Sequence, residues 1–148
     1  MEPMQQRLDV QALAPQAYAA MRALQATVNE SGLETSLLEL VKIRASQING
    51  CAFCINMHVR EARKLGETEA RIYLLNAWGE SPGYTERERA ALAWTEALTL
   101  IHREHAPDAV YALARAQFSE REVVDLSVAI STINAWNRLA IAMRWLPR

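Results

Sequence analysis

Signals that start and stop α-helices recur along this chain of 148 residues, and they constrain its fold more than any other feature. The pattern S/T-x-x-E, in which a hydroxyl and a glutamate cap the first turn of a helix, occurs at Ser36, Thr85 and Ser119. Between such signals, apolar residues repeat with the helical period. No segment alternates apolar and polar residues in the way a half-buried β-strand does. The sequence therefore predicts an all-α fold.

These signals divide the chain into about six to seven helices in a single compact domain that spans residues 1–148. With 51% hydrophobic and 22% charged residues, a chain of this length can bury a core without disulfide or metal staples. The expected helices cover residues 10–30, 36–49, 51–65, 68–78, 85–103, a short segment from Pro107, and 119–145.

The charge and the hydropathy of the chain argue against nucleic acid and membranes as partners. The formal net charge of −1 produces no long-range field that would attract nucleic acid or an anionic membrane surface. No apolar run approaches the roughly 18 residues that a membrane-spanning helix needs. The first residues, MEPMQQRLDVQ, lack the basic and then apolar stretch of a signal peptide. We therefore expect a cytoplasmic protein without nucleic-acid or membrane partners, in a compartment where structural disulfides are rare.

The only two cysteines lie three residues apart in the stretch QINGCAFCINMH. If the Asn-Gly pair before Cys51 ends one helix and Cys51 opens the next, Cys51, Cys54 and His58 share one helix face. Amide groups and the positive end of the helix dipole then stabilise a thiolate in the first turn and lower the pKa of the thiol. The spacing of the two cysteines also permits a reversible disulfide.

Three chemical interpretations of this stretch remain open from the residues alone. A CxxC pair is typical of redox centres, although the absence of a βαβ pattern argues against a thioredoxin-like fold. Cys51, Cys54 and His58 also supply three zinc ligands, but no second CxxC or HxxxH motif completes a tetrahedral site. Alternatively, the cysteines pack in the core as small apolar side chains. Because both thiols lie in one turn, the spacing does not determine which one reacts first.

A thiolate that attacks a peroxide also needs a group that delivers a proton to the leaving oxygen. Glu39, twelve residues before Cys51, is the candidate, because it approaches the thiols if the two helices pack together. The capping pattern with Ser36 explains the same glutamate without a catalytic role. Arg44 is expected beside the thiols, in a pair with Glu39, or at the surface, and Lys42 receives no assignment.

Other polar residues are expected to have structural roles. Asn134, Asn137 and Arg138 interrupt an apolar stripe of the last helix, and an unpaired buried polar group costs on the order of 1–3 kcal/mol. Hydrogen bonding at a helix end or between subunits is therefore expected for them, rather than catalysis. His102 and His105 are spaced to bind a metal, but without a carboxylate-histidine motif nearby we expect a solvent-exposed pair.

The segment ELVKIRASQINGCAFCINMHVREARKLG resembles the signature of the alkyl hydroperoxidase D group within the carboxymuconolactone decarboxylase-like superfamily. The pattern of that group is a glutamate, an arginine, and then S/N-Q-x-N-G-C-x-x-C-x-x-x-H. The later stretch INAWNR resembles the final helix of small members, and the two blocks lie in one alignable span over about residues 36–143. The residues that match the first pattern are Glu39, Arg44, Ser46, Gln47, Asn49, Gly50, Cys51, Cys54 and His58.

This resemblance implies an all-helical protein that assembles into homotrimers or homohexamers and reduces peroxides through its thiols. It makes Cys54 the peroxidatic thiol and Cys51 the resolving thiol, with Glu39 and His58 in a proton relay. The Cys54 thiolate would become a sulfenic acid, which Cys51 captures as a disulfide. An external dithiol, of lipoyl type or on a protein, would then reduce the disulfide, and no bound cofactor or metal is expected.

One position departs from the best-studied hydroperoxidases of this group, which carry a second histidine just before the second cysteine. Here that residue is Phe53, which removes one proton donor and makes the surroundings of the thiols more apolar. A general disulfide oxidoreductase or a non-catalytic redox sensor that uses the same CxxC pair therefore remains an alternative to a peroxidase. The decarboxylase branch fits less well, because those enzymes do not need a CxxC pair.

Overall fold

Helices follow one another along the chain, with no strand between them, in the computed structural model of residues 1–148. The all-α prediction is therefore confirmed. None of the helices combines the length and the apolar character that a membrane crossing requires. In chain order the segments are α1 (Val10–Leu13), α2 (Pro15–Asn29), α3 (Thr35–Asn49), α4 (Ala52–Lys64), α5 (Glu69–Tyr73), the 3₁₀-helix η1 (Leu75–Glu80), α6 (Glu86–Thr99), α7 (Ile101–Glu104), α8 (Asp108–Gln117) and α9 (Glu120–Met143).

The segments outnumber the six to seven expected helices because three of those helices are divided. Pro15 has no amide hydrogen and restricts the residue before it, so the expected helix over residues 10–30 becomes α1 and α2. The expected helix over 68–78 becomes α5 and η1. The helix over 85–103 divides into α6 and α7 at Leu100, whose φ of −99° and ψ of 39° leave the helical region.

Two of the three predicted capping boxes are present. Those at Thr85 and Ser119 cap α6 and α9, each together with the glutamate three residues later. The prediction at Ser36 is wrong, because α3 begins two residues earlier, with Glu34 as its N-cap residue. Ser36 therefore lies inside the first turn of α3, and Glu39 caps nothing. A different reason is needed for a glutamate at that position.

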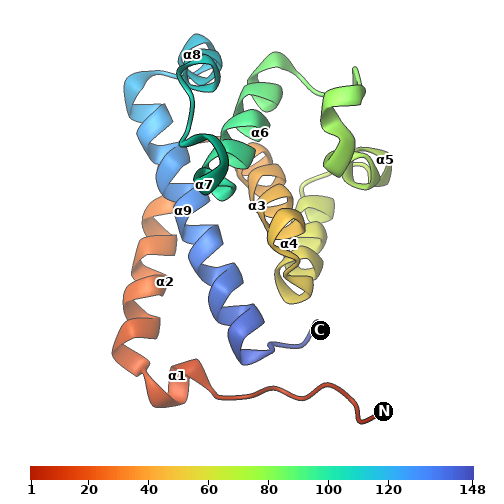
Figure 1. Cartoon of the computed structure of the whole chain (residues 1–148), viewed down its shortest axis with the longest axis vertical. Helices are drawn as coiled ribbons and strands as arrows, with labels where there is room; N and C mark the ends of the chain where they lie inside the picture. The colour runs from red at the N-terminus through yellow and green to blue at the C-terminus, as the bar shows by residue number, and fades with distance from the viewer.

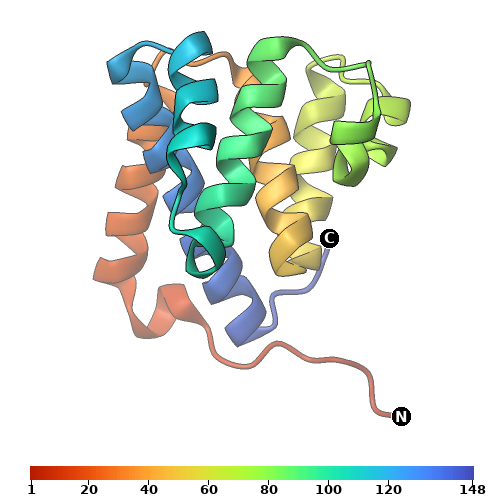
Figure 2. The same ribbon diagram turned by 45° about the horizontal axis from the view of Figure 1, so that its top comes forward.

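Helix α3 lies at the centre of the fold and packs against α4, α6 and α9. Figures 1 and 2 show α9 on one side of it and α4 on the other. Nine of its residues are buried, and they cover every side of the helix, as expected for a helix that is enclosed by its neighbours. One apolar core lies on the α9 side and includes Ile130, and a second lies on the α4 side and includes Ile43. Two of the nine buried residues, Glu39 and Lys42, carry charges that need partners.

The N-terminal region contributes little to these two cores. Helix α2 packs along α9, yet Val28 is its only buried residue. The residues before α1 form an extended segment that Figures 1 and 2 show passing the end of α9. Arg7 ties this segment to the end of α9 through hydrogen bonds from its backbone amide and its guanidinium to two carbonyls there. The position of α2 therefore depends on a narrow contact with α9.

The revised helix starts predict different sensitivities for two serines. Ser119→Ala removes the hydroxyl that accepts a hydrogen bond from the Glu122 amide, and we expect the free energy of unfolding to fall by about 1 kcal/mol. Ser36→Ala is the matched control, and because Ser36 is exposed within α3 it should change that free energy by less than about 0.5 kcal/mol. Urea unfolding at one protein concentration measures both values. Equal losses in the two variants would contradict the assigned helix starts.

Candidate active site

Cys51 and Cys54 are joined by a disulfide at the start of α4, with their Cα atoms 5.3 Å apart. Gly50 makes this start possible, because it ends α3 in the left-handed conformation (φ 73°) that glycine adopts most readily. Cys51 then becomes the N-cap residue of α4, and its sulfur accepts a hydrogen bond from the Cys54 amide at 3.3 Å. The helix break predicted before Cys51 is therefore present, and the CxxC spacing does bring the two sulfurs together.

The two cysteines differ in their surroundings, although each is at most 2% exposed. Cys54 lines a pocket, whereas Cys51 lies behind it as the residue that receives the amide hydrogen. A hydrogen bond from an amide at the N-terminus of a helix stabilises a thiolate. The Cys51 sulfur therefore accepts the amide hydrogen at the helix N-terminus, and the Cys54 side chain faces the pocket. The sequence had placed both thiols in the first turn without this distinction.

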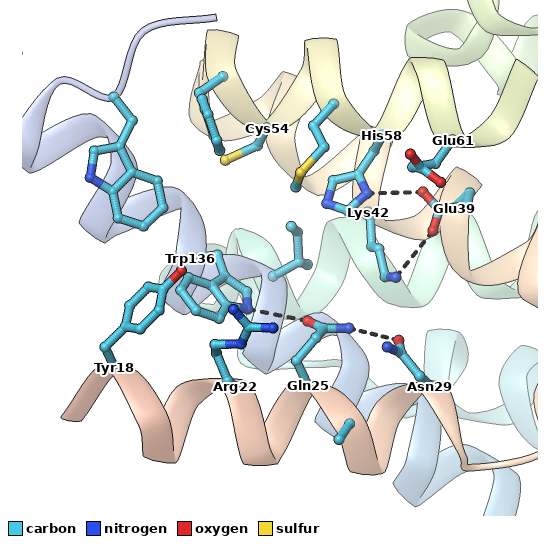
Figure 3. Close-up of a pocket in the computed structure, with 15 residues that line it drawn as sticks. Tyr18, Arg22, Gln25, Asn29, Glu39, Lys42, Cys54, His58, Glu61 and Trp136 are labelled. Carbon is cyan, nitrogen blue, oxygen red and sulfur yellow. Dashed lines mark hydrogen bonds and ion pairs between the residues drawn. The ribbon is translucent and has the colours of Figure 1, made fainter. Parts of the chain in front are cut away.

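The pocket has a volume of about 530 Å³ and lies between α2 and α4, with α3 and α9 completing its walls. Figure 3 shows Cys54 and His58 reaching toward it from α4, and Tyr18, Arg22, Gln25 and Asn29 facing them from α2. The lining residues are Tyr18, Arg22, Gln25, Ala26, Asn29, Glu39, Lys42, Phe53, Cys54, Met57, His58, Glu61, Ile133, Trp136 and Trp145.

Glu39 forms hydrogen bonds with two positively charged or chargeable side chains at the edge of this pocket. One carboxylate oxygen lies 2.9 Å from Nδ1 of His58, and the other accepts a hydrogen bond from Nζ of Lys42 at 3.1 Å (Figure 3). The exposed fractions of the three side chains are only 7% for Glu39, 12% for His58 and 7% for Lys42. The central helix therefore buries a carboxylate whose two oxygens are both paired.

The charge state of Glu39 determines the orientation of the histidine. Burial raises the pKa of Glu39, but the hydrogen bonds and charges of His58 and Lys42 outweigh this effect and leave the pKa below its ordinary value. Glu39 is therefore ionised at neutral pH, and an ionised carboxylate can only accept hydrogen bonds. Nδ1 of His58 must then carry a hydrogen, which leaves Nε2 free to exchange a proton with a group in the pocket.

A buried polar network holds the turn between α3 and α4. The side chain of Asn49 donates to Oδ1 of Asn134 at 2.9 Å and to Oδ1 of Asn137 at 3.0 Å. Asn137, which is completely buried, donates to the hydroxyl of Ser46 at 3.0 Å. The amide of Cys51 donates to the carbonyl of the same serine at 3.0 Å. The asparagines of the last helix thus have the structural role expected for them, and this role is to fix the position of Cys51.

Four aromatic side chains form a continuous series along the pocket. Phe53 packs edge-on against Trp145 with ring centroids 5.4 Å apart, Trp145 lies 6.2 Å from Trp136, and Trp136 lies 5.8 Å from Tyr18. Phe53, the residue that stands where the resemblance places a histidine, therefore contributes an apolar contact. Sequence reasoning did not find this series, because its members come from four separate segments.

The remaining candidates lie elsewhere or were missed. Arg44 pairs with Glu96 of α6 at 3.0 Å instead of joining the thiols. Lys42 had no assignment, although its spacing of three residues from Glu39 on a helix was a usable signal for the ion pair. His102 and His105 are exposed, as expected.

The arrangement of the side chains also bears on the zinc interpretation. The sulfurs of Cys51 and Cys54 are bonded to each other, and Nδ1 of His58 faces Glu39. No group of three histidine, cysteine or acidic side chains with a geometry suited to a metal ion occurs in the chain. The site built by these residues is therefore a thiol pair with an adjacent histidine–carboxylate pair.

Comparisons with known proteins place this site in a family context. A sequence model described as the carboxymuconolactone decarboxylase family matches residues 15–97, which include all four candidate catalytic residues. The uncharacterised protein YdfG of Bacillus subtilis (strain 168) is 45% identical over 140 residues, which are 95% of this chain and 95% of that protein.

Solved structures show the same fold over nearly the whole chain. A protein of unknown function from Agrobacterium tumefaciens, suggested to be the antioxidant defence protein AhpD, aligns with a TM-score of 0.95 and 46% identity over 97% of this chain and 99% of that one. The debrominase Bmp8 aligns with a TM-score of 0.78 and 20% identity over 90% of this chain and 72% of that one. The second likeness shows the fold alone, and debromination is the activity of that protein.

Removing the charge of Glu39 tests the buried pairing. Glu39→Gln leaves His58 and Lys42 without a carboxylate, and we expect the free energy of unfolding at pH 7 to fall by about 2–3 kcal/mol. Glu61→Gln is the control, because Glu61 lines the same pocket but is about half exposed in its pair with Lys64. That variant should lose less than about 0.5 kcal/mol.

The pH dependence of the stability difference between wild type and Glu39→Gln tests whether Glu39 is ionised in the folded protein. Because folding lowers the pKa of Glu39, its stabilising contribution is complete above the ordinary value of 4.5 and is lost as the pH falls through the lowered value. The difference in stability between the wild type and Glu39→Gln should therefore shrink as the pH falls from 7 to about 3 in urea unfolding measurements. A difference that stayed constant over this range would show that Glu39 is not held in its ionised form.

Proposed function

The chain belongs to the carboxymuconolactone decarboxylase family, and we propose that this member is a thiol-dependent peroxidase that reduces organic hydroperoxides. The proposal rests on one observation: Cys54, bonded to Cys51, lines a pocket in which His58 follows one turn later on the same helix. The CxxC pair and the AhpD-like fold together support an oxidoreductase. The steps below assign a role to each of these side chains.

In the first step, the reduced Cys54 thiolate attacks one oxygen of the hydroperoxide. The O–O bond breaks, the sulfur becomes a sulfenic acid, and the alkoxide leaves as an alcohol after it takes up a proton. His58 lines the pocket, Glu39 holds its Nδ1, and Nε2 is the ring nitrogen that can supply that proton. Lys42 balances the charge of Glu39 throughout and keeps the carboxylate from being protonated in its place.

In the second step, the Cys51 thiolate attacks the sulfur of the Cys54 sulfenic acid. A disulfide forms, and hydroxide leaves as water after it takes up a proton. The amide of Cys54, which lies 3.3 Å from the Cys51 sulfur, favours the thiolate that performs this attack. The geometry therefore supports Cys54 as the peroxidatic thiol and Cys51 as the resolving thiol.

In the third step, an external dithiol restores the reduced pair. One of its thiolates attacks the sulfur of Cys54, which lines the pocket, and Cys51 leaves as a thiolate that the same amide stabilises. The second thiol of the reductant then attacks the mixed disulfide, so two electrons pass from the dithiol to the protein. A small or lipoyl-type dithiol suits this site, since Cys54 is only 2% exposed and a protein surface cannot reach it directly.

The same burial and the apolar Phe53 favour a second candidate function, a redox sensor or a general disulfide oxidoreductase. Phe53 packs against Trp145 and provides no proton donor near the thiols. A site that reacts with peroxide but exchanges slowly with dithiols would remain oxidised and report on peroxide without turning over. The two functions use the same cysteines and differ in the rate of re-reduction.

Cysteine variants separate the assigned roles. With dithiothreitol as the reductant, we expect Cys54→Ser to lose all peroxide consumption above background. Cys51→Ser should still form one sulfenic acid per chain, trapped by dimedone on Cys54 and detected by mass spectrometry. A sulfenic acid that instead accumulates on Cys51 in the Cys54→Ser variant would reverse the proposed order.

The wild type distinguishes the two candidate functions in the same assay. A peroxidase consumes many equivalents of cumene hydroperoxide per chain while dithiol is present. A sensor consumes one equivalent and stops, with dithiothreitol, reduced lipoamide and reduced thioredoxin alike. The second result would replace the peroxidase proposal with the sensor.

We also propose that copies of this chain assemble into homotrimers or homohexamers through the N-terminal region. This region exposes several large apolar side chains, including Met4 (64% exposed), Leu8 (57%) and Leu13 (69%). Leu24, further along in α2, is also exposed. An extended segment with few contacts to its own chain does not recover the conformational entropy lost on ordering, so a second copy that covers these apolar side chains would stabilise it. The family resemblance implies the same assembly.

Light scattering after size exclusion tests the assembly. We expect the mass of three or six chains for the wild type and a smaller species for the double variant Leu8→Glu/Leu13→Glu. Leu113→Glu, which adds the same charge at an exposed leucine of α8, is the control and should keep the wild-type mass. A monomeric wild type at micromolar concentration would contradict the proposal.

A further inference from the structure

We propose that the pocket selects hydroperoxides that combine an apolar, ring-sized body with a carboxylate, and that Arg22 binds the carboxylate. This inference rests on the proposed peroxidase function and adds the class of substrate to it. It follows from the face that α2 turns toward the thiols, from the charges around the pocket and from its aromatic lining.

Helix α2 behaves as a wall of the pocket and contributes little to the core. The side chains that it directs toward α4 recur three or four residues apart and therefore share one face (Figure 3). In most helices of globular proteins such a face fills a core, but α2 buries only Val28. The residues on this face are Tyr18, Arg22, Gln25, Ala26 and Asn29.

Arg22 is the cation of the pocket that has no partner. Glu39 is paired with His58 and Lys42, and Glu61 is paired with Lys64 at 3.1 Å. Arg22 forms none of the ion pairs or side-chain hydrogen bonds of the chain. A guanidinium presents a planar fork of donors that matches a carboxylate. The pocket therefore offers an anion one free site, on the wall opposite Cys54.

The amide side chains next to Arg22 are bonded to each other and to the indole of Trp136. Oε1 of Gln25 accepts a hydrogen bond from Nε1 of Trp136 at 3.1 Å, and Nε2 of Gln25 donates to Asn29 at 2.9 Å (Figure 3). These bonds hold the indole of Trp136 in place as well as the two amides. Arg22 is therefore the charged donor that this wall offers to a carboxylate, and the amides orient the wall around it.

The wall around the thiol is aromatic. The aromatic series contains three neighbouring pairs of rings, with centroid distances of 5.4 Å for Phe53–Trp145, 6.2 Å for Trp145–Trp136 and 5.8 Å for Trp136–Tyr18. Such rings bind an apolar, planar body favourably through their edges and faces. Because Phe53 directly precedes Cys54, the apolar body would lie beside the reacting oxygen atoms.

The size of the pocket also fits an organic substrate. Its volume of about 530 Å³ falls within the range that holds a small organic ligand, and eight of its fifteen lining residues are hydrophobic. Hydrogen peroxide would fill only a small part of this space and contact neither the aromatic wall nor Arg22. In the reaction itself the O–O bond breaks at Cys54, the carboxylate is unchanged, and the product is the corresponding hydroxy acid.

A matched pair of substrates tests the inference by turnover. With dithiothreitol as reductant, kcat/KM for 4-carboxycumene hydroperoxide should exceed that for cumene hydroperoxide by about tenfold, the effect of one charge-assisted contact at a partly exposed site. Arg22→Gln should remove this preference, because the carboxylate then loses its charged partner. Arg60→Gln is the control, because Arg60 is an exposed arginine of α4 that does not line the pocket. Equal kcat/KM ratios in the wild type and Arg22→Gln would overturn the role of Arg22.

A binding measurement makes the test independent of turnover. 4-Isopropylbenzoate carries the same ring and carboxylate but no peroxide, and 4-isopropylbenzamide is its neutral counterpart. Trp136 and Trp145 line the pocket, so their fluorescence should report binding of either compound. We expect the benzoate to bind wild type and Arg60→Gln about tenfold more tightly than Arg22→Gln, and the benzamide to bind all three alike.

The two measurements fail in different ways. Selective benzoate binding without peroxide turnover would leave the recognition site standing and remove the peroxidase proposal. Turnover of both hydroperoxides with no discrimination, and equal binding of the benzoate and benzamide to the wild type, would keep the peroxidase and overturn the carboxylate site.

Discussion

Glu39, on the central helix α3, has a buried and ionised carboxylate. Without partners, such a buried ion would lower the stability of the fold by several kcal/mol. Both of its oxygens are therefore paired, one with Lys42 on the same helix and the other with His58 on α4. The second of these bonds connects two helices, so the packing of α4 on α3 and the orientation of the histidine are determined together. A change that separates these helices would also release the imidazole from the position in which Nε2 faces the pocket.

A second network of hydrogen bonds holds the turn between α3 and α4, just before Cys51. The side-chain amide of Asn49 links the end of α3 to two asparagines of α9. One of these, Asn137, donates a hydrogen bond to the hydroxyl of Ser46, and the carbonyl of Ser46 accepts a hydrogen bond from the backbone amide of Cys51. Two elements that are distant in the sequence therefore hold a turn of only a few residues. This turn places the Cys51 sulfur on the amide of Cys54 and leaves Cys54 facing the pocket. Two chemically identical side chains thereby acquire different surroundings.

The sequence predicts the parts of this structure that depend on local signals. Thr85 and Ser119 cap helices because a hydroxyl and a glutamate within one turn suffice, and the Asn-Gly pair before Cys51 ends α3 because glycine adopts a left-handed conformation readily. Ser36 carries the same local pattern as the other two caps but does not cap a helix, because α3 begins at Thr35 with Glu34 as its N-cap residue. Whether a capping signal is used depends on packing beyond the pattern.

Contacts between distant segments are what the sequence does not reveal. The bond between Glu39 and His58 spans nineteen residues, and the one between Gln25 and Trp136 spans 111. No periodicity encodes such pairs, because they depend on which helices become neighbours after folding. The family pattern did bring Glu39 and His58 together as a relay, but it contains nothing about Arg22 or the aromatic series, which belong to α2 and to the end of the chain.

The shallow attachment of α2 has a consequence for how this protein can change over evolutionary time. The helix forms one wall of the pocket, yet Val28 is its only residue in the core, whereas the thiols, the histidine and the glutamate are held by α3, α4 and α9. Substitutions on the inner face of α2 therefore alter what the pocket accepts at little cost to folding. The cysteine pair and the wall that faces it across the pocket thus belong to separately packed parts of the chain, so the wall can change in sequence while the cysteine pair stays intact.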